Sequence, residues 1–172
     1  MVVTAESLVL GPRNSQTENE NCRALRELPE DVRVKIIQEV LDKNRALGLR
    51  LAMRTIRSKK FFVEILNRGL DAADASEIYY WLECVSPRIG PKRILRILGE
   101  RLADNPEAVA KATYWMPRFI AQDNSQQVEI LQSLNQSLEA LGAQRVPRIA
   151  EDPERPGVFL FGDIDGGPDE YD

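Results

Sequence analysis

The sequence predicts an all-α protein of about seven helices in antiparallel pairs. Apolar residues recur every three to four positions along residues 28–142, which is the spacing of one helix face. A proline or a capping residue precedes most of these stretches, as at helix starts. The third observation is an internal repeat between Ser76 and Leu138. Together these patterns favour a short right-handed helical-repeat solenoid, with an irregular bundle as the alternative.

The repeat consists of an aromatic-apolar helix, a polar turn and a Leu/Ile helix. Tyr80 and Trp81 align with Tyr114 and Trp115 at an offset of about 34 residues. With a slightly longer second turn the Leu/Ile helices align as well, and the matched residues are Ile94, Leu95, Leu98 and Leu102 in the first copy and Ile130, Leu131, Leu134 and Leu138 in the second. Such a period is typical of helical repeats, whose units bury their apolar faces by stacking on one another.

Three helices are expected in the first half of the chain. The segment 28–31 (Leu-Pro-Glu-Asp) predicts a helix start, because proline suits the first turn and the acids complement the helix dipole. The apolar stripe that follows ends near Asn44, and a second helix is expected from about Arg45 to Arg57. Ser58 is a candidate cap for a third helix that ends at Gly69.

Prolines set the helix boundaries of the second half. Pro91 and Pro106 each suit a first helical position, where the missing N–H costs nothing. Pro87 is expected to end the helix before it, and Pro117 is expected to break a helix near Met116. The four helices predicted here cover about residues 75–86, 91–102, 106–116 and 124–142, the last with Asn124 as its cap.

The helical stretch from 28 to 142 resembles a short HEAT-like α-helical repeat domain. The residue spacings of tetratricopeptide repeats and the Thr-Pro-Leu-His of ankyrin repeats are absent from it. The resemblance implies a scaffold or adaptor that binds another macromolecule, although some such domains bind nucleic acid and a few act on damaged DNA bases, with an active site that has no match here.

The predicted organisation has three parts. Residues 1–26 are polar and irregular and are expected to form a flexible leader, although their apolar residues offer the alternative of a docked extended segment. Residues 27–142 form the helical domain, and residues 143–172 form an extended, proline-containing acidic tail. No apolar run is long enough to span a membrane and no signal peptide is evident, so a cytoplasmic location is expected.

Composition excludes several kinds of chemistry. The chain has no histidine, which removes Ser-His-Asp and Cys-His catalysis and the commonest general base. Its two cysteines, Cys22 and Cys84, are too few for a four-thiolate zinc site and do not indicate a disulfide framework. Asp163 and Asp165 resemble the start of a calcium loop, but the chain ends before the remaining ligands. No catalytic residue, metal or cofactor is therefore predicted.

Charge is distributed unevenly along the chain, whose net charge is −4. The segment from Arg45 to Arg118 carries 14 Lys/Arg against 8 Asp/Glu, whereas residues 151–172 carry 8 acidic residues and one arginine. This arrangement suggests that the acidic end reaches the basic body, with the apolar segment from Val158 to Phe161 as its anchor. The tail would then act as an intramolecular cap or as a tether for a partner.

Two groups of residues are candidates for a binding surface. The aromatic residues Tyr80, Trp81, Tyr114 and Trp115 form either the core of the hairpins or platforms for a peptide or an unstacked base. The basic residues are Arg88, Lys92, Arg93, Arg96 and Arg118, several of which share a helix face. Arg50, Arg54 and Arg57 form a second basic stripe that would complete a positive groove if it lies on the same side.

The sequence therefore favours a non-enzymatic interaction domain that binds a protein partner through an aromatic and basic helical face. The alternative is a nucleic-acid-binding helical module that uses the basic residues and is covered by the acidic tail. No established nucleic-acid-binding motif supports the alternative. The sequence predicts no membrane association and leaves the oligomeric state open.

Overall fold

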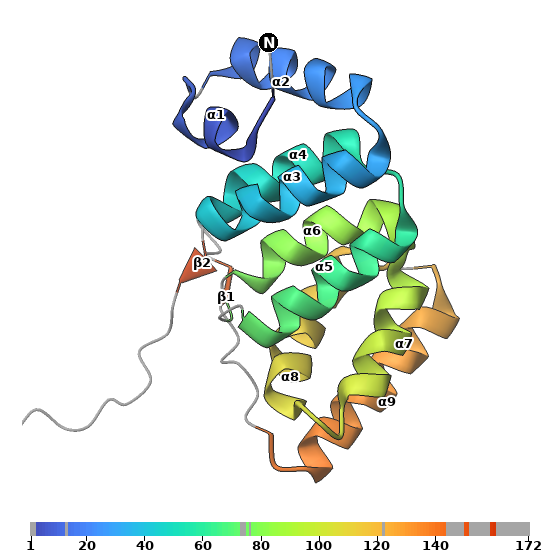
Figure 1. The fold of residues 1–172 in the computed structure, drawn as a ribbon. Helices are drawn as coiled ribbons and strands as arrows, with labels where there is room; N and C mark the ends of the chain where they lie inside the picture. The colour runs from blue at the N-terminus through green and yellow to red at the C-terminus, as the bar shows by residue number, and fades with distance from the viewer. Residues whose placement is uncertain are drawn as a thin grey trace, which may run out of the picture.

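The computed structural model describes residues 3–12, 14–72, 75, 77–121 and 123–143, and the backbone of 150–151 and 159–160. The described residues form an all-α fold (Figure 1). Its helices are α1 (Ala5–Leu10), α2 (Ser15–Glu27), α3 (Glu30–Lys43), α4 (Arg45–Thr55), α5 (Lys59–Ala72), α6 (Ile78–Ile89), α7 (Pro91–Arg101), α8 (Pro106–Trp115), the short 3-10 helix η1 (Met116–Arg118) and α9 (Ser125–Ala140). The two-residue strands β1 (Ala150–Glu151) and β2 (Phe159–Leu160) pair antiparallel.

The helices stack in successive layers. Helices α3 and α4 pack against each other along their lengths, as do α5 and α6. Contacts between layers join α1 to α3, α2 to α4, α4 to α6, α6 to α8 and α7 to α9. Figure 1 shows α1 and α2 at one end of this stack and α7, α8 and α9 at the other. Each layer buries its apolar side against the next, while the handedness of the stack and its relation to HEAT repeats stay predictions.

The seven predicted helices correspond to α3 through α9. Pro91 and Pro106 are the first residues of α7 and α8, as their fixed backbone geometry favours. The amide oxygen of Asn124 accepts the backbone N–H of Gln127 and caps α9. Pro117 has the expected effect, because α8 ends at Trp115 and continues only as the 3-10 helix.

Pro87 does not end its helix as predicted. Helix α6 continues through it to Ile89 and ends at Gly90, whose φ of 79° lies in the left-handed region. The missing N–H of Pro87 removes one hydrogen bond from the last turn only, so the helix persists and glycine ends it instead.

The structure also differs from the predicted flexible leader, because residues 5–10 and 15–27 are helical and packed. Thr4 and Asn14 cap α1 and α2 through their side-chain oxygens. Leu8 and Leu25, which are 4% and 0% exposed, belong to the main core. The segment has few apolar residues, and they are buried only because α1 and α2 stack on α3 and α4. The folded body thus begins well before residue 27.

The predicted tail, residues 143–172, lies almost entirely outside the described residues, and so does the expected docking of the apolar segment from Val158 to Phe161. Only the backbone pairing of β1 with β2 is described there. Within the described part of the chain, no helix has the length and apolar character needed to cross a bilayer.

The C-terminal end of α4 is held by three arginines from three other helices. They come from α2, α3 and α6: Arg26, Arg33 and Arg88 donate to the carbonyl oxygens of Arg54, Thr55 and Met53, respectively. The C-terminal end of a helix leaves its last carbonyls without intrahelical partners and carries partial negative charge. A guanidinium group donates hydrogen bonds to these carbonyls and also brings a positive charge to them. We call this arrangement the α4 joint.

The turn after the α4 joint is fixed by a carboxylate. Oε1 of Glu30 accepts the backbone N–H groups of Arg57 and Ser58, both at 2.8 Å. These two hydrogen bonds, with that from Arg57 the larger contributor, hold the pKa of Glu30 below its ordinary value of 4.5. Glu30 at the start of α3 therefore positions the start of α5.

Two glycines in helices offer a matched test of the packing between layers. A Cβ at Gly69 would lie 2.6 Å from Cγ of Trp81, because α5 and α6 approach closely there. At Gly99 the nearest atom, Cδ2 of Leu134, would be 3.7 Å away. We expect Gly69→Ala to lower the free energy of unfolding by about 1–3 kcal/mol through overpacking. Gly99→Ala should raise it by about 0.5–1 kcal/mol through helix propensity, and urea denaturation of both variants measures the difference.

Glu30 makes stability dependent on pH. Because its pKa is lowered in the folded state, its contribution is present above the unfolded value near 4.5 and is lost as the pH falls through the folded value. The stability difference between wild type and Glu30→Gln should therefore be largest near neutral pH and shrink below 4.5. Urea midpoints from neutral pH to about pH 3 measure this difference, and a difference that stays constant with pH would contradict the role of the carboxylate.

Candidate partner-binding surface

The nine residues predicted to bind a partner do not form one continuous face. They occupy five environments. Trp81 lies in the core, Arg88 lies in the α4 joint, Tyr80 lies beside α4, the group Tyr114, Trp115 and Arg118 lies in an aromatic cluster, and the group Lys92, Arg93 and Arg96 lies along a groove beside α9.

Trp81 and Arg88 have structural roles. Trp81 is 1% exposed and packs against Gly69, so its ring is not a platform for a partner. Arg88 donates to the carbonyl of Met53, and its guanidinium carbon lies 5.8 Å from the centroid of the Phe62 ring. Both residues hold α6 in the stack, and contact between Arg88, which is half-buried, and a partner stays a prediction.

The second aromatic pair lies in a half-buried cluster between α6 and α8. The indole N–H of Trp115 donates to the carbonyl oxygen of Ala75 at 2.9 Å. The rings of Tyr79 and Tyr114 lie 5.2 and 5.0 Å from that of Trp115. The guanidinium of Arg118 lies 5.0 Å from the centroid of the Trp115 ring, a cation–π distance. These contacts join the two repeat copies in one cluster with part of its surface accessible.

A groove between α7 and α9 brings three predicted basic residues together with apolar ones. Its volume is about 900 Å³, and we call it the α7–α9 groove. Its floor is apolar and is formed by Ile89, Leu95, Ile130 and Leu134, while its rim carries Lys92, Arg93 and Arg96. The groove thus combines a surface that favours apolar contact with a positively charged edge.

The rim of the α7–α9 groove remains positive after its local pairs are considered. Arg96 forms an exposed ion pair with Glu100 at 3.4 Å, which is a weak interaction in water. Lys92 donates to the amide oxygen of Gln126 at 3.4 Å, which leaves its charge unpaired among the described residues. Arg93 is exposed. Three cations of α7 therefore line one side of an apolar floor, with one carboxylate among them.

Tyr80 lines a smaller hollow between α4 and α6. This hollow has a volume of about 380 Å³, and Tyr80 is 60% exposed at its edge. Leu49 and Met53 contribute apolar surface to it, and an ion pair between Arg45 and Glu77 crosses it. An exposed tyrosine beside apolar side chains is a feature of protein contact sites.

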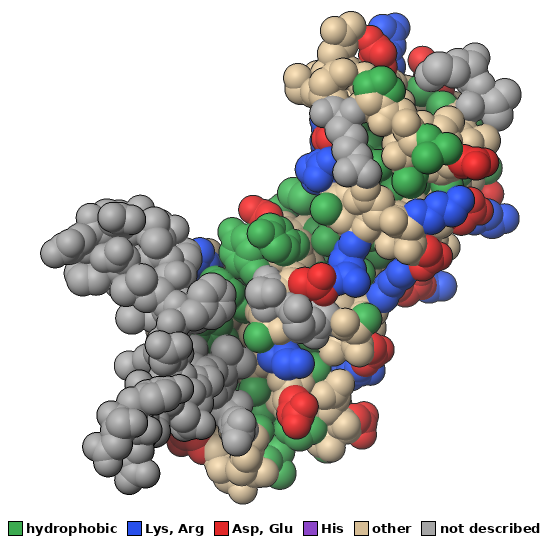
Figure 2. All heavy atoms as spheres, turned by 90° about the vertical axis from the view of Figure 1, so that its left-hand side faces the viewer, with side chains coloured by type: hydrophobic (Ala, Val, Ile, Leu, Met, Phe, Trp, Pro, Cys, Tyr) green, Lys and Arg blue, Asp and Glu red, His purple; other side chains and the backbone are tan. Residues whose placement is uncertain are grey.

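Arg50 and Arg54 do not extend the basic rim of the α7–α9 groove. They pair with the carboxylate of Glu18 on α2, each at 3.1 Å, and line a different pocket. Acidic and basic side chains lie next to one another across the side of the molecule that Figure 2 shows, rather than in separate patches. The single positive groove that both stripes would have formed is absent from the described residues.

Both cysteines are free, buried thiols. Burial raises the pKa of Cys84 to about 12, although the nearby Arg88 lowers it, and burial likewise raises the pKa of Cys22. The Cys84 thiol donates to the carbonyl of Leu49 at 3.6 Å. Both behave as small core residues, as predicted for Cys84.

Comparison with known proteins gives no relative from which a function is transferred: no family model, no curated protein and no solved structure matches the chain. Within the described residues, no group of three or more Cys, Asp and Glu side chains is arranged to hold a metal ion.

Proposed function

We propose that this chain is a non-enzymatic scaffold that binds a protein partner, and that the partner contacts the α7–α9 groove. The apolar floor beside the basic residues of α7 is the observation that carries the proposal. An amphipathic helix with acidic residues beside its apolar stripe has the complementary chemistry, because such helices place their apolar face in a groove. The acids would meet Lys92, Arg93 and Arg96.

Energetic considerations favour a peptide-like segment over a purely electrostatic ligand. Burial of apolar surface contributes about 25 cal/mol per Å², so the floor supplies most of the affinity. The rim charges supply orientation and a faster association rate, which falls as salt is added.

The nucleic-acid alternative has less support. The basic residues that it required are Arg50, Arg54, Arg88, Lys92, Arg93 and Arg96. Of these, Arg88 is engaged in the α4 joint, and Arg50 and Arg54 pair with Glu18. The remaining three lie beside an apolar floor, whereas phosphate backbones are bound by extended positive surfaces.

A photo-activatable amino acid placed in the groove tests contact directly. We expect a residue of this kind at Ser133, which lines the groove, to form a covalent adduct with a protein in native lysate. The same amino acid at the exposed neighbour Gln132, which does not line the groove, should form none. The adduct should survive nuclease treatment. Its loss after nuclease, or equal yields at the two positions, would contradict the proposal.

Charge reversal on the rim tests the partner's chemistry. Lys92→Glu/Arg93→Glu should weaken binding of the cross-linked partner at least about tenfold, since two attractive contacts become repulsive. Lys59→Glu/Lys60→Glu is a matched control, because these exposed residues occupy the first turn of α5 as Lys92 and Arg93 occupy the first turn of α7. Titration by fluorescence anisotropy measures both affinities, and equal effects of the two variants would show that the groove is not the contact site.

A further inference from the structure

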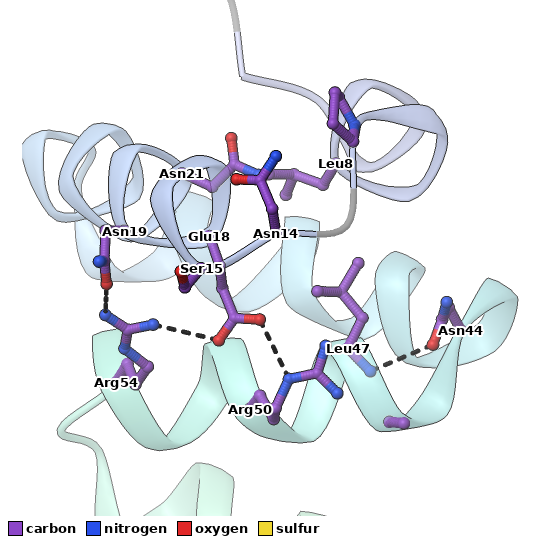
Figure 3. A pocket seen from close by; sticks show the side chains of 12 residues that line it. Leu8, Asn14, Ser15, Glu18, Asn19, Asn21, Asn44, Leu47, Arg50 and Arg54 are labelled. Carbon is purple, nitrogen blue, oxygen red and sulfur yellow. Dashed lines mark hydrogen bonds and ion pairs between the residues drawn. The ribbon is translucent and has the colours of Figure 1, made fainter.

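A second pocket lies at the other end of the stack, between α2 and α4. Its volume is about 500 Å³, and it shares no residue with the α7–α9 groove. Figure 3 shows Glu18 of α2 between Arg50 and Arg54 of α4, with Asn19 beside Arg54. Leu8 and Leu47 form an apolar part of its wall. We call it the α2–α4 pocket, and its size is typical of small-molecule sites.

Three of the four amide oxygens that line this pocket, those of Asn14, Asn19 and Asn44, are already engaged. Oδ1 of Asn14 accepts the backbone N–H of Thr17 at 2.8 Å, and Oδ1 of Asn44 accepts that of Leu47 at 3.1 Å. Both are helix caps, so the oxygen must face the backbone donor and the NH₂ group must face elsewhere.

The side-chain oxygens of Glu18 and Asn19 also accept hydrogen bonds. The two carboxylate oxygens of Glu18 accept from Nη1 of Arg54 and Nε of Arg50, both at 3.1 Å. Oδ1 of Asn19 accepts from Nη2 of Arg54, and because guanidinium only donates, the amide orientation is again determined.

What remains in the pocket is mostly donors, together with the amide of Asn21 and the hydroxyl of Ser15. The NH₂ groups of Asn14, Asn19 and Asn44 and the terminal nitrogens of Arg50 have no hydrogen-bond partner among the described residues. Two guanidinium groups face one carboxylate, so the pocket keeps a net positive charge. The Arg50 side chain is 52% exposed and that of Arg54 37%, so both are within reach of a ligand.

We propose that the α2–α4 pocket binds a small molecule that carries an oxyanion, either a carboxylate or a phosphate group. Such a group offers only acceptors, whereas the lining of the pocket offers mainly donors. Arg50 is the principal cation of the pocket. The Glu18 carboxylate occupies one donor of each arginine and so competes with the ligand. This site goes beyond the protein-binding role and does not depend on it.

The test is titration with inorganic phosphate and with succinate, against sodium chloride at equal ionic strength. Two-dimensional NMR should show ligand-dependent shifts of the side-chain amide signals of Asn14, Asn19 and Asn44. Phosphate and succinate together separate the two sources of the oxyanion. If neither shifts these signals more than chloride does, the proposal is overturned.

Two substitutions, one that removes a positive charge from the pocket and one that removes a negative charge, make the test specific. Arg50→Gln should weaken binding about tenfold or more, and Glu18→Gln should strengthen it severalfold, because the competing negative charge is removed. A general loss of stability does not produce both changes. Lys92→Gln removes the same charge from the α7–α9 groove and should leave the affinity unchanged. Equal effects of Arg50→Gln and Lys92→Gln, or no gain from Glu18→Gln, would contradict the site.

Discussion

The C-terminal end of α4 is the constraint on which the rest of the structure depends. Its last carbonyls accept from guanidinium groups on α2, α3 and α6, so one helix end joins three layers of the stack. Apolar packing between layers is not directional and tolerates sliding, whereas these hydrogen bonds specify the register. Glu30 then fixes the following turn, so that α5 begins in a defined direction. The stack is therefore a packed core aligned by polar contacts at one helix end.

The α4 joint and the pairing with Glu18 also divide the basic residues into two classes. Arg50, Arg54 and Arg88 are engaged in holding helices together, whereas Lys92, Arg93 and Arg96 of α7 are exposed beside an apolar groove. Two separate surfaces result, a donor-rich pocket at one end and a basic, apolar-floored groove at the other. Their lack of shared residues allows each to be altered without the other.

Local signals predicted most of the fold. Pro91 and Asn124 determine helix starts through backbone geometry and capping, which need no knowledge of distant residues.

The predictions that failed concern residues whose environment is set by contacts far along the chain. Trp81 and Trp115 align in the sequence, but only Trp81 is fully buried in the core, because Gly69 opposite it has no side chain. Leu25 sits in a polar segment whose helix is stabilised by stacking, and the role of Arg88 depends on a carbonyl 35 residues away. The α2–α4 pocket was missed because its polar residues are caps and ion-pair partners from two helices that lie far apart in the sequence.

The most direct test of this account compares the free energy of unfolding of Arg88→Met with that of Lys35→Met. Both replace a long cation by the same helix-compatible side chain, but Arg88 belongs to the α4 joint and Lys35 is exposed on α3. We predict that Arg88→Met loses about 1.5–3 kcal/mol, the range for a hydrogen bond to a charged group, and that Lys35→Met changes by less than about 0.5 kcal/mol. Equal, small changes for the two variants would show that the joint does not hold the stack.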